Sequence, residues 1–157
     1  MSARVTTTDN MAALHSIIQK LSKLEVYVGI TEDKSPREEG TVSNAELMFI
    51  HTKGSPLRGI PARPSIEPSI EKNKEAISAE LKVAMQLALE GKSEEVKLQL
   101  DSVGDFASGK AREYFTDPEN GWAENSPKTI KTKGSDRPLI DTGALRQAIT
   151  YMVGDKK

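Results

Sequence analysis

Two short segments of the chain alternate apolar and polar residues with a period of two. The first covers residues 24–30, where Val26, Val28 and Ile30 occupy every second position. The second covers residues 147–153, with apolar side chains at 149, 151 and 153. Successive side chains of a strand point to opposite faces of a sheet, so the alternation predicts two half-buried strands. We expect both to belong to one small, mainly antiparallel sheet.

Residues 11–21 repeat apolar residues at spacings of three and four, which is the period of a helix. The repeating positions are Met11, Leu14, Ile18 and Leu21. Thr8 or Asp9 is placed to cap such a helix at its N-terminus. The pattern therefore predicts a first helix with one buried face, preceded by an N-terminal arm at residues 1–8.

Two longer segments, residues 66–90 and 93–114, carry the same helical period. Gly91 separates them, and Ser93, which precedes two glutamates, is the expected N-cap of the second. Their apolar stripes are Ile70, Ile77, Leu81, Ala84 and Ala88 in the first, and Val96, Leu100, Val103, Ala107, Ala111 and Tyr114 in the second. We predict an antiparallel pair of long helices that covers the sheet.

Two glycines interrupt the second long segment, at Gly104 and Gly109. Each weakens a helix by about 1 kcal/mol relative to alanine, unless close packing uses the missing side chain. The helix is therefore expected to bend near them or to be approached closely there.

The remaining segments predict a short helix and two extended passages. Ser43 and Glu46 have the spacing of a capping box, and Gly54 is placed to end the helix that follows in a left-handed cap. Prolines recur through residues 55–65, and a polar, lysine-rich run occupies residues 122–141. We expect an α+β fold in a single domain of 157 residues, with an extended loop at 122–141.

Composition narrows the function classes. The chain has 22 basic and 23 acidic residues, so no net field draws it as a whole to nucleic acid or to an anionic membrane. Hydrophobic residues make up 36% and aromatic residues 4%, while there are 11 glycines and 8 prolines. Segments with so little apolar content are expected to order partly on partners. No run reaches the roughly 18 apolar residues of a spanning helix, and no signal peptide is expected, so we expect no membrane partner.

The sequence contains no recognisable catalytic or metal-binding pattern. Cysteine is absent, and there is no phosphate-binding loop, dinucleotide glycine pattern or H-E-x-x-H motif. Of the two histidines, His15 is expected at the surface and His51 near the C-terminus of its helix. We therefore predict that the protein is not an enzyme and has no catalytic residue, cofactor or metal.

Four short runs, in this order, carry a family resemblance. They are GIPARP at 59–64, GWAE at 121–124, SPKTI at 126–130 and LIDTGALRQAITY at 139–151. A chain with these runs, and with long helices between the first and the second, resembles the tail-completion, or neck, proteins of long-tailed double-stranded DNA phages. The resemblance covers about residues 45–153.

The resemblance implies a structural virion protein that completes the tail and joins it to the head. Its expected location is the virion neck, after assembly in the host cytoplasm. It implies a homohexameric ring between a head-side connector or stopper protein and a tail terminator or tail tube protein, with genome DNA passing through the lumen. Tail terminators and head-tail stoppers occupy the same region and remain alternatives within the class.

The candidate subunit-interface residues come from these runs. They are Pro61, Arg63, Pro64, Trp122, Lys128, Lys131, Lys133, Arg137, Leu139, Asp141, Thr142 and Gly143. Trp122 could anchor its loop on the core of its own chain, which tryptophan favours, or contact another subunit. The basic residues at 128–137 could form a solvated face or a phosphate-binding arm, so a DNA-binding module is an alternative from another class.

Overall fold

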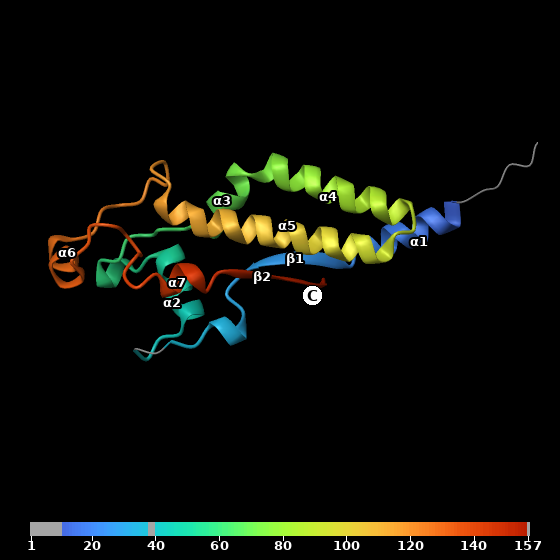
Figure 1. Cartoon of the computed structure of the whole chain (residues 1–157). Coiled ribbons are helices and arrows are strands. Elements are labelled where there is room, and N and C mark those ends of the chain that lie inside the picture. The colour runs from blue at the N-terminus through green and yellow to red at the C-terminus, as the bar shows by residue number, and fades with distance from the viewer. Residues whose placement is uncertain (1–10, 38–39, 157) are drawn as a thin grey trace, which may run out of the picture.

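The sheet and the two long helices lie side by side along an elongated molecule (Figure 1). The structure is a computed structural model that describes residues 11–37 and 40–156. Strands β1 (Leu24–Gly29) and β2 (Thr150–Asp155) pair antiparallel, with Val26 opposite Val153 and Val28 opposite Tyr151. Helices α4 (Lys74–Leu89) and α5 (Ser93–Glu113) form the hairpin. The α+β fold is confirmed.

Helix α5 is shared by two hydrophobic clusters. Toward its C-terminus, Ala111 packs with residues of α2 (Asn44–Lys53), the 3-10 helix η3 (Tyr114–Thr116) and α7 (Ala144–Gln147). That first cluster contains Met48, Ala111, Phe115, Leu145 and Ile149. Nearer the hairpin turn, Ala84, Val96 and Leu100 form the second cluster, against which Leu21 and Val26 pack. Each end of the molecule therefore depends on α5.

Helix α5 approaches the sheet closely at Gly104. A Cβ atom added there would lie 2.2 Å from Cδ2 of Tyr151 on β2. Nearby, the Arg112 guanidinium donates to the Ile149 carbonyl at 2.8 Å, which ties the same helix to the start of β2. Of the two glycines, Gly104 is thus used for close packing, whereas Gly109 has only an Arg112 nitrogen at 3.9 Å.

Several helix boundaries differ from the prediction. The expected helix over 66–90 is two helices, α3 (Ile66–Lys72) and α4, because the Asn73 side chain donates to the Ser69 carbonyl at 2.8 Å and ends the first. Ser93 is the first residue of α5 and its side chain makes no capping bond, since the turn at Gly91 starts the helix one residue early. The capping box of α2 is confirmed, but Gly54 ends that helix with ψ 177°, outside the left-handed helical region.

Helix α1 (Met11–Leu21) lacks the buried face that was predicted for it. Ile18 is 53% exposed, and none of the residues of α1 is buried. The physical reason is its position, because α1 runs beyond the turn of the α4–α5 hairpin and only its C-terminal end, at Leu21, reaches the second cluster (Figure 1). The expected cap at Thr8 or Asp9 and the arm at 1–8 lie outside the described residues.

The two passages predicted to be extended are more folded than expected. Within 122–141, helix α6 (Pro127–Lys133) begins at Ser126, whose Oγ accepts from the Thr129 amide at 3.2 Å. Within 55–65, the 3-10 helix η2 (Pro56–Arg58) is closed by paired backbone bonds between Ser55 and Ile60. A further 3-10 helix, η1 (Glu32–Lys34), precedes α2. Local capping and turn chemistry thus fold both passages within one chain.

Candidate functional site

The resembling runs, which are far apart in sequence, gather at one end of the molecule. We call this end the end lobe: it comprises residues 40–65 and 121–147, including α2, η2, α6 and α7 (Figure 1). Side-chain to backbone hydrogen bonds join its segments, as the contacts of Arg63, Trp122 and Asn125 show. The lobe is therefore the part of the fold in which the candidate interface residues can act together.

Arg63 is the central clamp of the end lobe. It is only 6% exposed, and its guanidinium donates to the Ala123 carbonyl at 3.0 and 2.8 Å and to the Glu124 carbonyl at 2.9 Å. A buried guanidinium is tolerated when its donors are satisfied, and burial lowers the pKa of Arg63. Arg63 thus fixes the GIPARP run against the GWAE run and faces its own chain.

Trp122 anchors the same loop on the core of its own chain. Its indole Nε1 donates to the Pro64 carbonyl at 2.9 Å. Its ring meets Phe115 and Tyr114 edge to face, with centroid separations of 5.3 and 6.1 Å. Of the two readings of Trp122, the structure supports the intramolecular one, and Pro64 acts as its acceptor.

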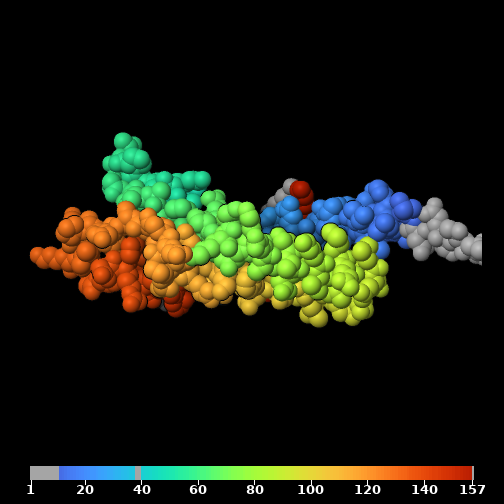
Figure 2. Space-filling view, turned by 90° about the horizontal axis from the view of Figure 1, so that it is seen from above, coloured from blue at the N-terminus to red at the C-terminus, as the bar shows by residue number. Residues whose placement is uncertain are grey.

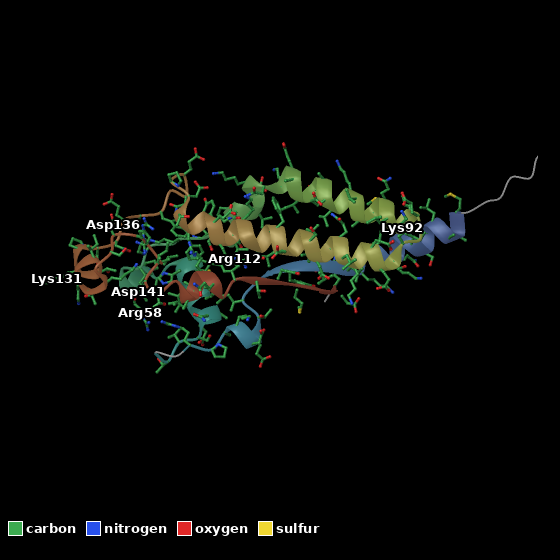
Figure 3. The ribbon with its side chains drawn as sticks, viewed as in Figure 1. Arg58, Lys92, Arg112, Lys131, Asp136 and Asp141 are labelled. Carbon is green, nitrogen blue, oxygen red and sulfur yellow. The ribbon has the colours of Figure 1, made fainter. Side chains whose placement is uncertain are left out.

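The lysine-rich run is tied at both ends. Asn125 donates to the Asp136 carbonyl at 3.1 Å, and Lys133 Nζ donates to the Arg137 carbonyl at 2.6 Å. Burial lowers the pKa of Lys133. By contrast, Lys128, Lys131 and Arg137 have exposed side chains, and Lys131 lies at the far end of the lobe (Figure 3).

A hollow of about 1350 Å³ opens within the end lobe. Parts of α2, the η2 turn, α6 and α7 surround it. Seven of the candidate residues line it: Pro61, Arg63, Lys133, Leu139, Asp141, Thr142 and Gly143. The other five lie outside the lining. Pro64 and Trp122 are hydrogen-bonded to each other, and Lys128, Lys131 and Arg137 are exposed.

Two polar atoms in the lining lack a hydrogen-bond partner within the described chain. They are Oδ1 of Asn44 and Nδ1 of His51. Asn44 is 5% exposed, and its amide nitrogen donates to the carbonyls of Lys34 and Pro36, which leaves the oxygen as a spare acceptor. Burial, and then the charges of Arg63 and Lys133, lower the pKa of His51, so its ring is neutral near pH 7. Both atoms are inaccessible to solvent, so they lie behind the surface of the hollow and each carries the desolvation cost of an unpaired polar group.

Leu139 contributes backbone strain to the same wall. Its φ is 57°, in the left-handed region that a leucine rarely occupies. Such a conformation costs about 1–3 kcal/mol and persists only where the surrounding packing imposes it. Leu139 packs against the first hydrophobic cluster as well as lining the hollow. The LIDTG run therefore has a conformation that is set by the core.

Sequence reasoning missed two features of the end lobe. Asn44 was not identified as a site residue because its partners, at 34 and 36, belong to a loop with no pairing signal in the sequence. Leu57 was missed as well: it is fully exposed at the tip of the η2 turn, which projects from the lobe as the teal protrusion in Figure 2. Phe49, on the outer side of α2, is 65% exposed. Both side chains are therefore accessible to another molecule.

The described residues contain no group of three or more side chains suited to hold a metal ion. None of the helices in the described part of the chain is long and apolar enough to cross a bilayer. Comparisons with family models, curated proteins and solved structures found no match for this chain. The geometry of the end lobe and the runs that build it are therefore the basis for the functional conclusion.

Proposed function

We propose that the protein is a structural component of the neck of a long-tailed double-stranded DNA phage, where copies of it form a ring that completes the tail and joins it to the head-side connector. The observation that supports this most is the convergence of the four resembling runs in the end lobe. Runs separated by some sixty residues form one surface feature, which is expected if they act together in assembly.

The end lobe offers two different surfaces for assembly. One carries the exposed apolar side chains of Leu57 on the η2 turn and Phe49 on α2. The other is the hollow, which seven of the candidate interface residues line. Two unlike surfaces on one subunit can form head-to-tail contacts, which give a ring where the rotation between copies closes.

Assembly on this view uses surfaces that are already formed in the single chain. The two passages at 55–65 and 122–141 are folded within the single chain: α6 is capped by Ser126, and the η2 turn is closed on itself. Preformed surfaces associate without the entropy cost of ordering a disordered segment. The family resemblance is what implies six copies in the ring and the head-side and tail-side partners in the neck.

A second candidate is DNA binding by α6 and the residues after it. The side chains of Lys128, Lys131 and Arg137 are exposed and form no ion pair within the described residues. Phosphate contacts release counterions, so binding through these residues weakens steeply with salt. In a neck ring this surface would face the genome in the lumen. DNA affinity that is absent at low salt would remove this candidate.

The neck proposal is tested by substituting the projecting side chain. A phage that lacks the gene is complemented with Leu57→Asp, and Leu98→Asp, at a 69% exposed position on the outer side of α5, is the matched control. We expect unjoined heads and tails with the first variant and joined particles with the control, as seen by electron microscopy. Intact particles with Leu57→Asp, or labelled antibody binding away from the neck, would contradict the proposal.

A further inference from the structure

A second apolar surface lies between the sheet and the α3–α4 helices. It is a groove of about 410 Å³ whose lining is apolar apart from Glu25. Leu24, Val26 and Val28 of β1 form one wall, and Ile70, Ile77 and Leu81 of α3 and α4 form the other. Leu24 and Leu81 are exposed at its rim. A groove of this composition is typical of a site that takes an apolar side-chain stripe.

The same chain carries a stripe that suits this groove. Leu14 and Ile18 are exposed on α1, which projects past the hairpin turn (Figure 1). Helix α1 is 11 residues long, about 16 Å at 1.5 Å per residue. The α3–α4 wall of the groove runs over a similar stretch of chain, from Ile70 to Leu81. Helix α1 contains no acidic residue that would be set against Glu25.

Within its own chain, helix α1 already packs against α4. Leu21 packs against the cluster of Ala84, Val96 and Leu100, with Leu87 and Ala88 of α4 beside it. In Figures 1 and 2, α1 lies alongside the C-terminal part of α4 and extends beyond it. The N-terminal part of α4, at Ile77 and Leu81, borders the open groove instead. A second α1 placed there would continue the same helix-on-helix layer.

We infer that the groove between β1 and α3–α4 receives helix α1 of a second copy of this chain, through Leu14 and Ile18. The contact joins two different surfaces, so each copy can both donate its α1 and accept that of the next one. This contact would be one of the subunit contacts of the ring proposed above. It depends on that proposal only for the closure of the ring and the number of copies. The end lobe and this groove would then supply separate contacts between subunits.

The absence of cysteine from the sequence allows a direct test between copies. Ile18→Cys and Leu81→Cys are made in separate full-length proteins with tags of different mass, mixed, and oxidised mildly. We expect a mixed disulfide at least fivefold more abundant than in a control mixture of Lys131→Cys with Leu81→Cys, since Lys131 lies at the opposite end of the molecule (Figure 3). Equal cross-linking in the two mixtures, or a dominant Ile18–Ile18 disulfide, would overturn the inference.

A second measurement uses Ile18→Asp, at a position exposed in the single chain, with Leu98→Asp as the control. Circular dichroism should show unchanged folding for both. Analytical ultracentrifugation should show self-association weakened by roughly tenfold or more for Ile18→Asp alone, because a charge enters an apolar contact. Unchanged association of Ile18→Asp would refute the contact. If the selective cross-link forms but the protein is not found in phage necks, the neck proposal is contradicted and the groove contact stands. If the protein forms neck rings but the cross-link does not form, the groove contact is contradicted and the neck proposal stands.

Discussion

The contact between Gly104 and Tyr151 is the most stringent test of how α5 packs on the sheet. An added Cβ would lie 2.2, 2.5 and 2.8 Å from Cδ2, Cγ and Cε2 of the tyrosine ring. These atoms include the root of the ring, which cannot swing away as the end of a flexible side chain can. Gly104→Ala therefore forces either the ring from its place or the helix away from β2.

The magnitude follows from two opposed effects. Replacing glycine by alanine in a helix contributes about 1 kcal/mol of stability. Overpacking a well-packed contact costs about 1–3 kcal/mol, and ring atoms this close put Gly104→Ala at the upper end of that range. We expect a net loss of about 1–2 kcal/mol in the free energy of unfolding. At this chain length, each kcal/mol lowers Tm by about 2–4 °C.

Gly109→Ala is the matched control, because it lies in the same helix with only an Arg112 nitrogen at 3.9 Å. It should gain about 0.5–1 kcal/mol from the helix term alone. Urea unfolding followed by circular dichroism measures both variants. In a Tyr151→Leu background, Gly104→Ala should cost less than in the wild type, since the ring is gone. A Gly104→Ala variant as stable as Gly109→Ala would refute the packing reasoning.

The remaining predictions concern the end lobe. Arg63→Lys should lower the free energy of unfolding by about 2–4 kcal/mol in urea titrations, because one ammonium cannot replace the three hydrogen bonds to Ala123 and Glu124. A loss below about 0.5 kcal/mol, which is about half the value of one hydrogen bond, would contradict the role of Arg63 in joining these segments. The pKa of His51 is lowered in the folded state, so the unfolded chain binds a proton more readily than the folded one. The neutral imidazole therefore supports the free energy of unfolding above about pH 6.5, and this support is lost as the pH falls toward the folded pKa. Each tenfold weakening of proton binding costs about 1.4 kcal/mol. Stability should therefore fall less between pH 7.5 and 5.5 in His51→Gln than in the wild type or in exposed His15→Gln, and equal slopes would exclude this role. Leu57→Asp should leave Tm unchanged in calorimetry within about 1 °C, because its side chain touches solvent alone; a clear drop would mean that it packs on its own chain.

Periodicity in the sequence determined the elements and their pairing. Alternation at 24–30 and 147–153 predicted two strands, although β2 begins three residues later, at Thr150, because Gln147 is the last residue of α7. The stripes of the long helices predicted the hairpin, because burial on one face leaves a period that a buried strand or helix shows. Local capping chemistry was also readable, as the Ser43–Glu46 box shows. The runs that carry the resemblance identified residues that the fold then brought together at the end lobe.

Only the tertiary structure decided which surfaces are covered and which are free. The stripe of α1 has the same period as a buried helix, but its position past the hairpin turn leaves Ile18 exposed. Arg63, Trp122 and Asn44 have partners distant in sequence, and a pattern of single positions does not encode such pairs. Periodicity records that a residue can be buried, whereas burial itself depends on what the rest of the chain places against it.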